Sequence, residues 1–192
     1  MPAIAPDTSD ETPDDSSDAA LAAHLLTMPS ALAELSAQDA EFVIGYTLLR
    51  RFEAGTTVIA QGERDRTGFM FLVLDGDVSV ETVVVSRANP LVMSVMGPGS
   101  LLGEMGLLDG APRVASCIAL SDVTAAILTR SALAALIDAN PGIGAKLMIA
   151  ISQRLAERLR ESGQKLLAYT QLTRAMQQEI ESLDPSSSRR PN

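Results

Sequence analysis

The chain has 192 residues, of which 46% are hydrophobic, so it can form one sizeable domain with extensions. Its net charge of −9 argues against a nucleic-acid-binding surface, which needs a basic face. The single cysteine, Cys117, excludes an intramolecular disulfide and a cysteine-cluster metal site. Its strand-like surroundings indicate a buried structural thiol.

Residues 1–18 are rich in Asp, Ser, Thr and Pro and contain no Lys or Arg. Such a composition cannot bury enough apolar surface to order itself, so we predict a disordered acidic tail that serves as a solubilising segment or a docking motif. No apolar run approaches the ~20 residues of a membrane span, and an acidic N-terminus does not resemble a signal peptide. We therefore expect a soluble, cytoplasmic protein that does not contact membranes.

Residues 19–48 carry a helical pattern. Leu21, Leu25 and Leu26 would lie on one face of a first helix, and a proline separates it from a second. Ser36 is placed to cap the second helix, because its hydroxyl can accept a hydrogen bond from a first-turn N–H. The only histidine, His24, is expected to be a surface or half-buried residue of the first helix and not a ligand.

The apolar period changes to two between residues 50 and 128, where short β-rich runs alternate with glycine turns. Many short strands at this spacing predict a β-roll or jelly roll. Asp75 and Gly76 between two such runs predict a hairpin turn. The expected strands are 48–52, 57–60, 69–74, 78–85, 91–96, 114–120 and 123–129.

Ser131 is predicted to begin a short helix that ends before Pro141, and a long helix follows over residues 142–183. Its apolar positions recur in alternating steps of four and three, with charges on either side, which is typical of a coiled-coil seam. A parallel dimer through residues 155–183 is the favoured interpretation, and a seam folded back on its own domain is the alternative. The seam comprises Leu155, Leu159, Ser162, Leu166, Tyr169, Thr173, Met176, Ile180 and Leu183. Residues 184–192 are expected to be a second disordered tail.

The stretch 98–116 holds the candidate site. It passes from a glycine-rich turn into a helix start at Gly103 and Glu104, and a second turn then brings in Arg113. A helix start leaves backbone N–H groups unpaired, which suits an anion, and an arginine adds a planar fork of donors. The sequence therefore predicts a site for one phosphate, with a carboxylate beside it that can accept hydrogen bonds from hydroxyl groups.

Two motifs in this stretch, Gly-Glu-Met-Gly-Leu and Pro-Arg-Val-Ala-Ser, resemble the phosphate-binding cassette of the cyclic-nucleotide-binding domain family. The resemblance is strongest to the bacterial catabolite activator (cyclic-AMP receptor) branch and extends over residues 27–173. It implies a cyclic-nucleotide-binding domain over residues 19–141, mainly β with flanking helices. A long dimerisation helix over residues 142–183 would follow. We call residues 98–116 the cassette.

The resemblance also implies roles for single residues. Arg113 would pair with an exocyclic phosphate oxygen, Glu104 would accept the ribose 2′-hydroxyl, and the amides of Gly103, Glu104 and Met105 would complete the cradle. The alternative for Arg113 and Glu104 is a surface ion pair that stabilises the loop. Further ligand-binding positions that the resemblance implies are Val80, Ser94 and Leu102 along the sugar and base, and Ser162, which would touch adenine or be a tolerated polar residue in the seam.

Three departures from the family pattern limit this prediction. Leu102 replaces an aromatic residue, and Val114 stands where a Ser or Thr hydroxyl often contacts the phosphate or, in some members, guanine. Val114 therefore weakens the case for cGMP selectivity and predicts a lower affinity, and it favours a vestigial or retuned pocket. Only nine residues follow Leu183, so we expect no helix-turn-helix and no direct DNA binding.

With the resemblance, these features predict a dimeric sensor, not an enzyme, that binds cAMP, or cGMP as the alternative, and signals to an unidentified protein partner. The alternative is an interaction module whose pocket is vestigial or retuned, for example for cyclic di-GMP. No cofactor is expected, and His24 lies outside the strand region and has no second histidine with which to hold a metal.

Overall fold

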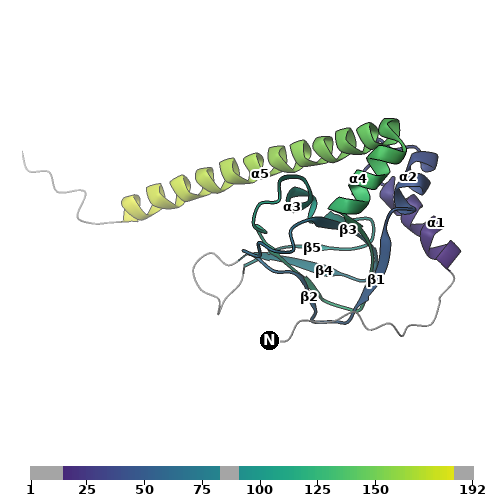
Figure 1. Ribbon diagram of the computed structural model, residues 1–192. Coiled ribbons are helices and arrows are strands. Elements are labelled where there is room, and N and C mark those ends of the chain that lie inside the picture. Colours follow the sequence, from purple (N-terminus) through teal and green to yellow (C-terminus); the bar gives the residue numbers. More distant parts are fainter. Residues whose placement is uncertain (1–14, 83–90, 184–192) are drawn as a thin grey trace, which may run out of the picture. The chain divides into compact units, whose positions relative to one another are not determined.

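The computed structural model describes residues 15–82 and 91–183 (Figure 1). The chain divides into two compact units, the first ending at Ile151 and the second beginning at Ser152. The predicted tails therefore lie outside the described residues up to residue 14 and from 184 onward, as does the predicted strand segment 83–85.

Two four-stranded antiparallel sheets form the body of the first unit, which confirms the predicted jelly-roll class. One sheet has the order β1 (Leu48–Phe52), β8 (Val123–Thr129), β3 (Phe69–Asp75) and β6 (Leu101–Leu102). The other has the order β2 (Thr57–Ile59), β7 (Ser116–Ala119), β4 (Val78–Thr82) and β5 (Leu91–Met96).

Apolar residues of both sheets meet in one core, as expected for strands whose side chains alternate between two faces. Phe71 at its centre is fully buried, and Cys117 is a buried thiol there, as predicted. The buried cluster comprises Val58, Ile59, Phe71, Val73, Val78, Leu102, Cys117, Ala119, Val123 and Ala125.

The prediction of a hairpin at Asp75 and Gly76 was wrong. The turn is present, but β3 pairs with β6 and β8, whereas β4 pairs with β5 and β7, so the chain crosses here from one sheet to the other. Gly76 adopts a φ of 82° with its backbone against the carbonyl of Asp122. The same local sequence serves a hairpin or a crossover because turn chemistry does not specify pairing partners.

Helices α1 (Asp15–Leu26), α2 (Ala37–Ile44) and α4 (Arg130–Ala139) gather at one end of the sheets (Figure 1). Helix α1 begins inside the segment predicted to be a disordered tail, because later residues of the helix bury apolar side chains and so order its first turn. Of the three leucines predicted to share one face of this helix, Leu25 and Leu26 are buried but Leu21 is exposed. Ser36 caps α2 as predicted. Helix α4 starts one residue earlier than predicted, since the Thr129 hydroxyl and not Ser131 accepts the N–H of Ala132.

The long helix α5 (Pro141–Leu183) belongs to both units. Its first turns pack into the first unit, where Leu147, Ala150 and Ile151 are buried. The compact β-containing unit therefore extends past the predicted boundary at residue 141, because the apolar face of α5 completes its core.

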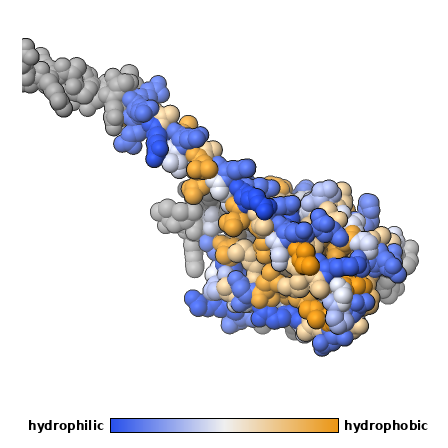
Figure 2. Space-filling view, turned by 90° about the horizontal axis from the view of Figure 1, so that it is seen from above, coloured by the Kyte–Doolittle hydropathy of each residue, from blue (hydrophilic) through white to orange (hydrophobic). Residues whose placement is uncertain are grey.

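The second unit contains the rest of α5, and every side chain from residue 159 to 180 is exposed. Hydrophobic and hydrophilic side chains alternate along this helix in Figure 2. None of the helices in the described part of the chain is both long and apolar enough to cross a membrane.

Candidate functional site

The cassette places a short helix, α3 (Glu104–Asp109), directly after Gly103. Gly103 has a φ of 84°, and a Cβ there would lie 3.0 Å from Ile59 Cδ1 and 3.1 Å from both Arg113 Nη1 and the carbonyl oxygen of Phe69. Both the left-handed backbone and this close packing require glycine. The helix start is thereby held tightly against β2, β3 and the arginine.

Arg113 is the central side chain of the site and is only 5% exposed. Its Nη1 donates to the carbonyl of Gly103 at 2.9 Å, and its Nη2 donates to the carbonyls of Phe69 at 2.9 Å and Arg66 at 3.1 Å. The guanidinium carbon also lies 4.6 Å from the centre of the Phe69 ring. Arg113 is therefore a buried, oriented group, and the alternative of a surface ion pair does not describe it.

One nitrogen of this guanidinium makes no hydrogen bond within the described residues. Arg113 Nε is buried and has no hydrogen-bond partner among the described residues, and the same is true of Oε2 of Glu63. Burial lowers the pKa of the Arg113 guanidinium, and the charge of Glu63 opposes that shift more than any other neighbouring group. A buried donor without a partner costs about 1–3 kcal/mol, so an anion that reached Nε would remove this cost.

Glu104 opens α3 and is 3% exposed, and its charge also favours the protonated form of Arg113. The structure thus brings together Gly103, Glu104 and Arg113, the three residues on which the predicted site depends. A carboxylate is rarely this buried, so Glu104 is not part of a solvated surface.

The remaining predicted residues differ in element and in exposure. Val80 pairs with Ser94 across β4 and β5, and Leu102 is buried in the core. Met105 is exposed, and Val114 is 63% exposed although it follows the buried Arg113. Ser162 lies in the second unit, where its hydroxyl donates to the carbonyl of Arg158 at 2.8 Å.

Sequence reasoning missed three contributors. The Phe69 ring lies against the guanidinium of Arg113. The negative charge of Glu63 stabilises the charged form of Arg113. The Arg130 side chain donates hydrogen bonds to the carbonyls of Gly106 and Leu107 in α3. Phe69 contributes through its ring and Arg130 through hydrogen bonds to backbone carbonyls, and neither kind of contact produces a spacing pattern in the sequence. Glu63 could have been found, because it follows the glycine turn at Gly62 that pairs with the Arg113 backbone.

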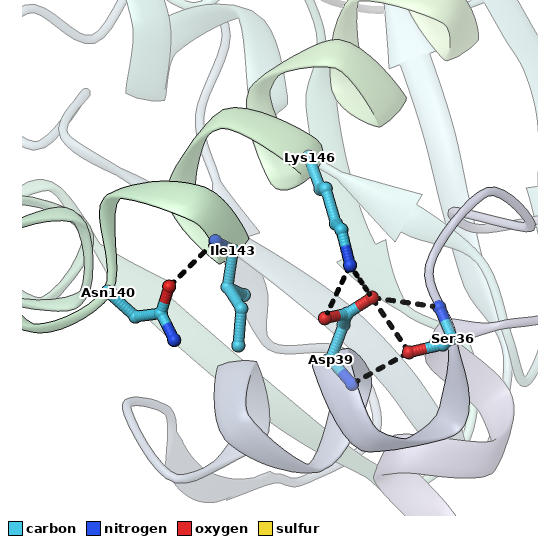
Figure 3. A network of polar contacts seen from close by, with 5 residues as sticks. All are labelled: Ser36, Asp39, Asn140, Ile143 and Lys146. Carbon is cyan, nitrogen blue, oxygen red and sulfur yellow. Dashed lines mark hydrogen bonds and ion pairs between the residues drawn. The ribbon is translucent and has the colours of Figure 1, made fainter.

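A second polar network joins α2 to the start of α5 (Figure 3). Lys146 Nζ donates to both carboxylate oxygens of Asp39, at 2.8 and 3.0 Å, and the Ser36 hydroxyl donates to Asp39 Oδ2 at 2.7 Å. The Asn140 side chain accepts the N–H of Ile143. The network borders a cavity of about 440 Å³ that shares no residue with the cassette, so it holds helices in place and is not the candidate site.

This network predicts acid sensitivity. The hydrogen bonds from Lys146, and then those from Ser36, hold the pKa of Asp39 below its ordinary value. The stability that Asp39 contributes is therefore present above the unfolded-state pKa of about 3.9 and is lost as the pH falls through the lower folded-state pKa. In urea unfolding from pH 7 down to about pH 3, Lys146→Met should weaken this pH dependence. An unchanged slope in the variant would contradict the assignment.

The sequence of this chain is similar to those of known cyclic nucleotide-binding proteins. Residues 49–140 match the sequence model of the cyclic nucleotide-binding domain. The chain is 31% identical over 106 residues to the CRP-like cAMP-activated global transcriptional regulator of Mycobacterium tuberculosis, covering 54% of this chain and 45% of that protein. It is 28% identical over 123 residues to the cyclic AMP receptor protein of Thermus thermophilus, covering 64% and 56%.

Among solved structures, a cyclic nucleotide-binding domain from Methylobacillus flagellatus superposes with a TM-score of 0.67 at 25% identity. The match covers 81% of this chain and 85% of that one. The chain spans about half the length of the two curated relatives named above.

Proposed function

Through residues 49–140 the chain belongs to the cyclic nucleotide-binding domain family, and on this premise we propose that it binds a 3′,5′-cyclic nucleotide, with cAMP favoured. The observation that carries the proposal is the buried Arg113 guanidinium with its unpartnered Nε, beside the glycine-initiated helix α3. A cyclic phosphate has one negative charge, which suits a single arginine.

Glu104 supplies the second half of recognition in this proposal. Its buried carboxylate at the start of α3 is placed beside Arg113, as a group that accepts a ribose 2′-hydroxyl next to the phosphate would be. A carboxylate there distinguishes a cyclic ribonucleotide from inorganic phosphate, because phosphate has no neighbouring sugar hydroxyl. The protein would thus act as a regulatory receiver and not as an enzyme.

The test of this role uses two ligands. Glu104→Gln should weaken the binding of cAMP by about tenfold, the cost of one charge-assisted hydrogen bond. The same change should leave the binding of 2′-deoxy-cAMP nearly unaltered, since that ligand lacks the hydroxyl. Calorimetric titration of both ligands measures the difference, and equal losses for both would remove Glu104 from ribose recognition.

A second candidate function is an interaction module whose pocket takes another nucleotide or none, and the exposure of Val114 favours it. An aliphatic side chain that is 63% exposed offers no hydroxyl to a phosphate or a guanine. Thermal denaturation with cAMP, cGMP and cyclic di-GMP separates the candidates, because the tightest ligand raises the melting temperature most. A rise with cyclic di-GMP alone would favour this second candidate.

The proposed output is a homodimer formed through residues 155–183 that signals to a protein partner. The seam residues Leu159, Leu166 and Ile180 are among the exposed large apolar side chains of the chain. Two copies that pack these stripes together would remove them from water. Ligand binding would then act on the partner through a change in helix geometry.

We expect light scattering to give the mass of a dimer for the wild type. Leu166→Asp should give a monomer, because it buries a charge at a seam position, whereas Leu167→Asp, one residue outside the seam, should remain a dimer. A wild-type monomer, or equal disruption by both variants, would contradict a dimer through this seam.

A further inference from the structure

Arg130, the first residue of α4, reaches back to the cassette helix. Its Nε donates to the carbonyl of Leu107 at 3.0 Å, and its Nη2 donates to the carbonyl of Gly106 at 2.9 Å. Both are carbonyls of α3, and that of Gly106 also accepts the backbone N–H of Gly110 at 3.1 Å. The backbone N–H of Arg130 also donates to the carbonyl of Gly68 at 2.8 Å.

The fit around this guanidinium is close on two sides. A Cβ at Gly110 would lie 3.2 Å from both Nη1 and Nη2 of Arg130, and a Cβ at Gly68 would lie 3.5 Å from its Cβ. Glycines thus line the path of the side chain, and the planar fork bonds two successive carbonyls. Neither lysine nor glutamine can reproduce both bonds from one rigid group.

Helix α3 is consequently held by an arginine at each end. Arg113 binds the carbonyl of Gly103 at its start, and Arg130 binds Gly106 and Leu107 toward its end. An anion that reaches Nε would bind the same guanidinium that holds the carbonyl of Gly103, so the contacts at the start of α3 would change. Any resulting shift of α3 reaches Arg130 directly.

From Arg130 the path continues into α5 through tightly packed backbone. A Cβ at Gly144 would lie 2.8 Å from Ile137 Cγ1 and 3.1 Å from its Cα, so the first turns of α5 pack closely against α4. The pair Asp39 and Lys146 fixes the same turns to α2. Packed elements of this kind move as units rather than deform continuously.

We propose that Arg130 is a positioning residue that couples the cassette helix α3 to α4 and the start of α5. This role rests on the proposed nucleotide binding, because it concerns what occupancy of Arg113 does to the rest of the domain. Arg130 touches no ligand, and its effect passes through the carbonyls of Gly106 and Leu107.

The test combines binding with hydrogen exchange on the full chain. In the wild type, saturating cAMP should change the exchange of backbone amides both in α3 and across residues 130–151. In Arg130→Gln, cAMP should bind within about tenfold of wild type, the size of a typical coupling factor. The change in α3 should persist, and the change across residues 130–151 should be lost.

Arg130→Lys keeps the charge but can bind only one of the two carbonyls, so it should restore part of the change in hydrogen exchange across residues 130–151. It replaces Arg130→Gln in the experiment if that variant does not fold. Arg51→Gln, an exposed arginine on β1, is the matched control and should behave as wild type. A full change across residues 130–151 in both Arg130 variants overturns the coupling role, as does no change there in the wild type. Absence of cAMP binding to the wild type instead removes the proposed function itself.

Discussion

Arg113→Ala should lower the affinity for cAMP by a factor of about 100 to 10,000. The guanidinium would make at least two charge-assisted hydrogen bonds to the phosphate, each contributing about 1.5–3 kcal/mol, and every 1.4 kcal/mol is a tenfold change in the dissociation constant. Calorimetric titration measures this loss. Arg64→Ala is the matched control, since Arg64 is an exposed arginine in the neighbouring loop and should bind normally.

The alanine variant has a second consequence that must be separated from the first. Removing Arg113 leaves the carbonyls of Gly103, Arg66 and Phe69 without this donor, so the folded state should also lose stability. Arg113→Lys keeps the charge but loses the fork, and it should bind cAMP more weakly than wild type while staying folded at 25 °C. A folded Arg113→Lys and a folded Arg113→Ala that both bind like wild type would contradict the assignment.

Gly76→Ala should lower the free energy of unfolding more than most single changes in this chain. A left-handed backbone costs a non-glycine residue about 1–2 kcal/mol. A Cβ at residue 76 would also lie 2.2 Å from the carbonyl oxygen of Asp122, and relieving that overlap costs about 1–3 kcal/mol more. The expected total is about 2–5 kcal/mol, measured by urea unfolding.

Gly55→Ala isolates the two contributions. Gly55 has nearly the same φ, 83°, but a Cβ there meets nothing within 4 Å. It should therefore lose only the backbone part, about 1–2 kcal/mol. Equal losses for Gly55→Ala and Gly76→Ala would show that the crossover between the sheets tolerates a side chain at residue 76.

Gly76 also shows where sequence reasoning ends. The residues Asp75 and Gly76 correctly predict a turn, because the turn depends on local φ and ψ. Which strands then pair depends on contacts across the domain, and here β3 and β4 separate into different sheets. The two-residue strand β6 was missed for the same reason, since Leu101 and Leu102 are too short a run to carry a period of two.

At the site, the predictable residues were those whose chemistry a ligand requires. Gly103, Glu104 and Arg113 carry a recognisable motif, and the structure brings them together. Arg130 was not predictable, because it binds backbone carbonyls, and a carbonyl has the same identity at every position of the sequence. The acidic start of α1 was predicted as a tail because its order comes from the buried residues that follow it and not from its own composition.

Titration of cAMP into the wild-type chain and into Arg113→Lys tests whether the buried guanidinium of Arg113 receives a cyclic phosphate. We expect one saturable site per chain in the wild type and a clear loss of affinity in the variant. If the folded wild type shows no saturable binding of cAMP up to about 1 mM, a concentration at which even an interaction of about 4 kcal/mol is detected, this role of Arg113 is contradicted.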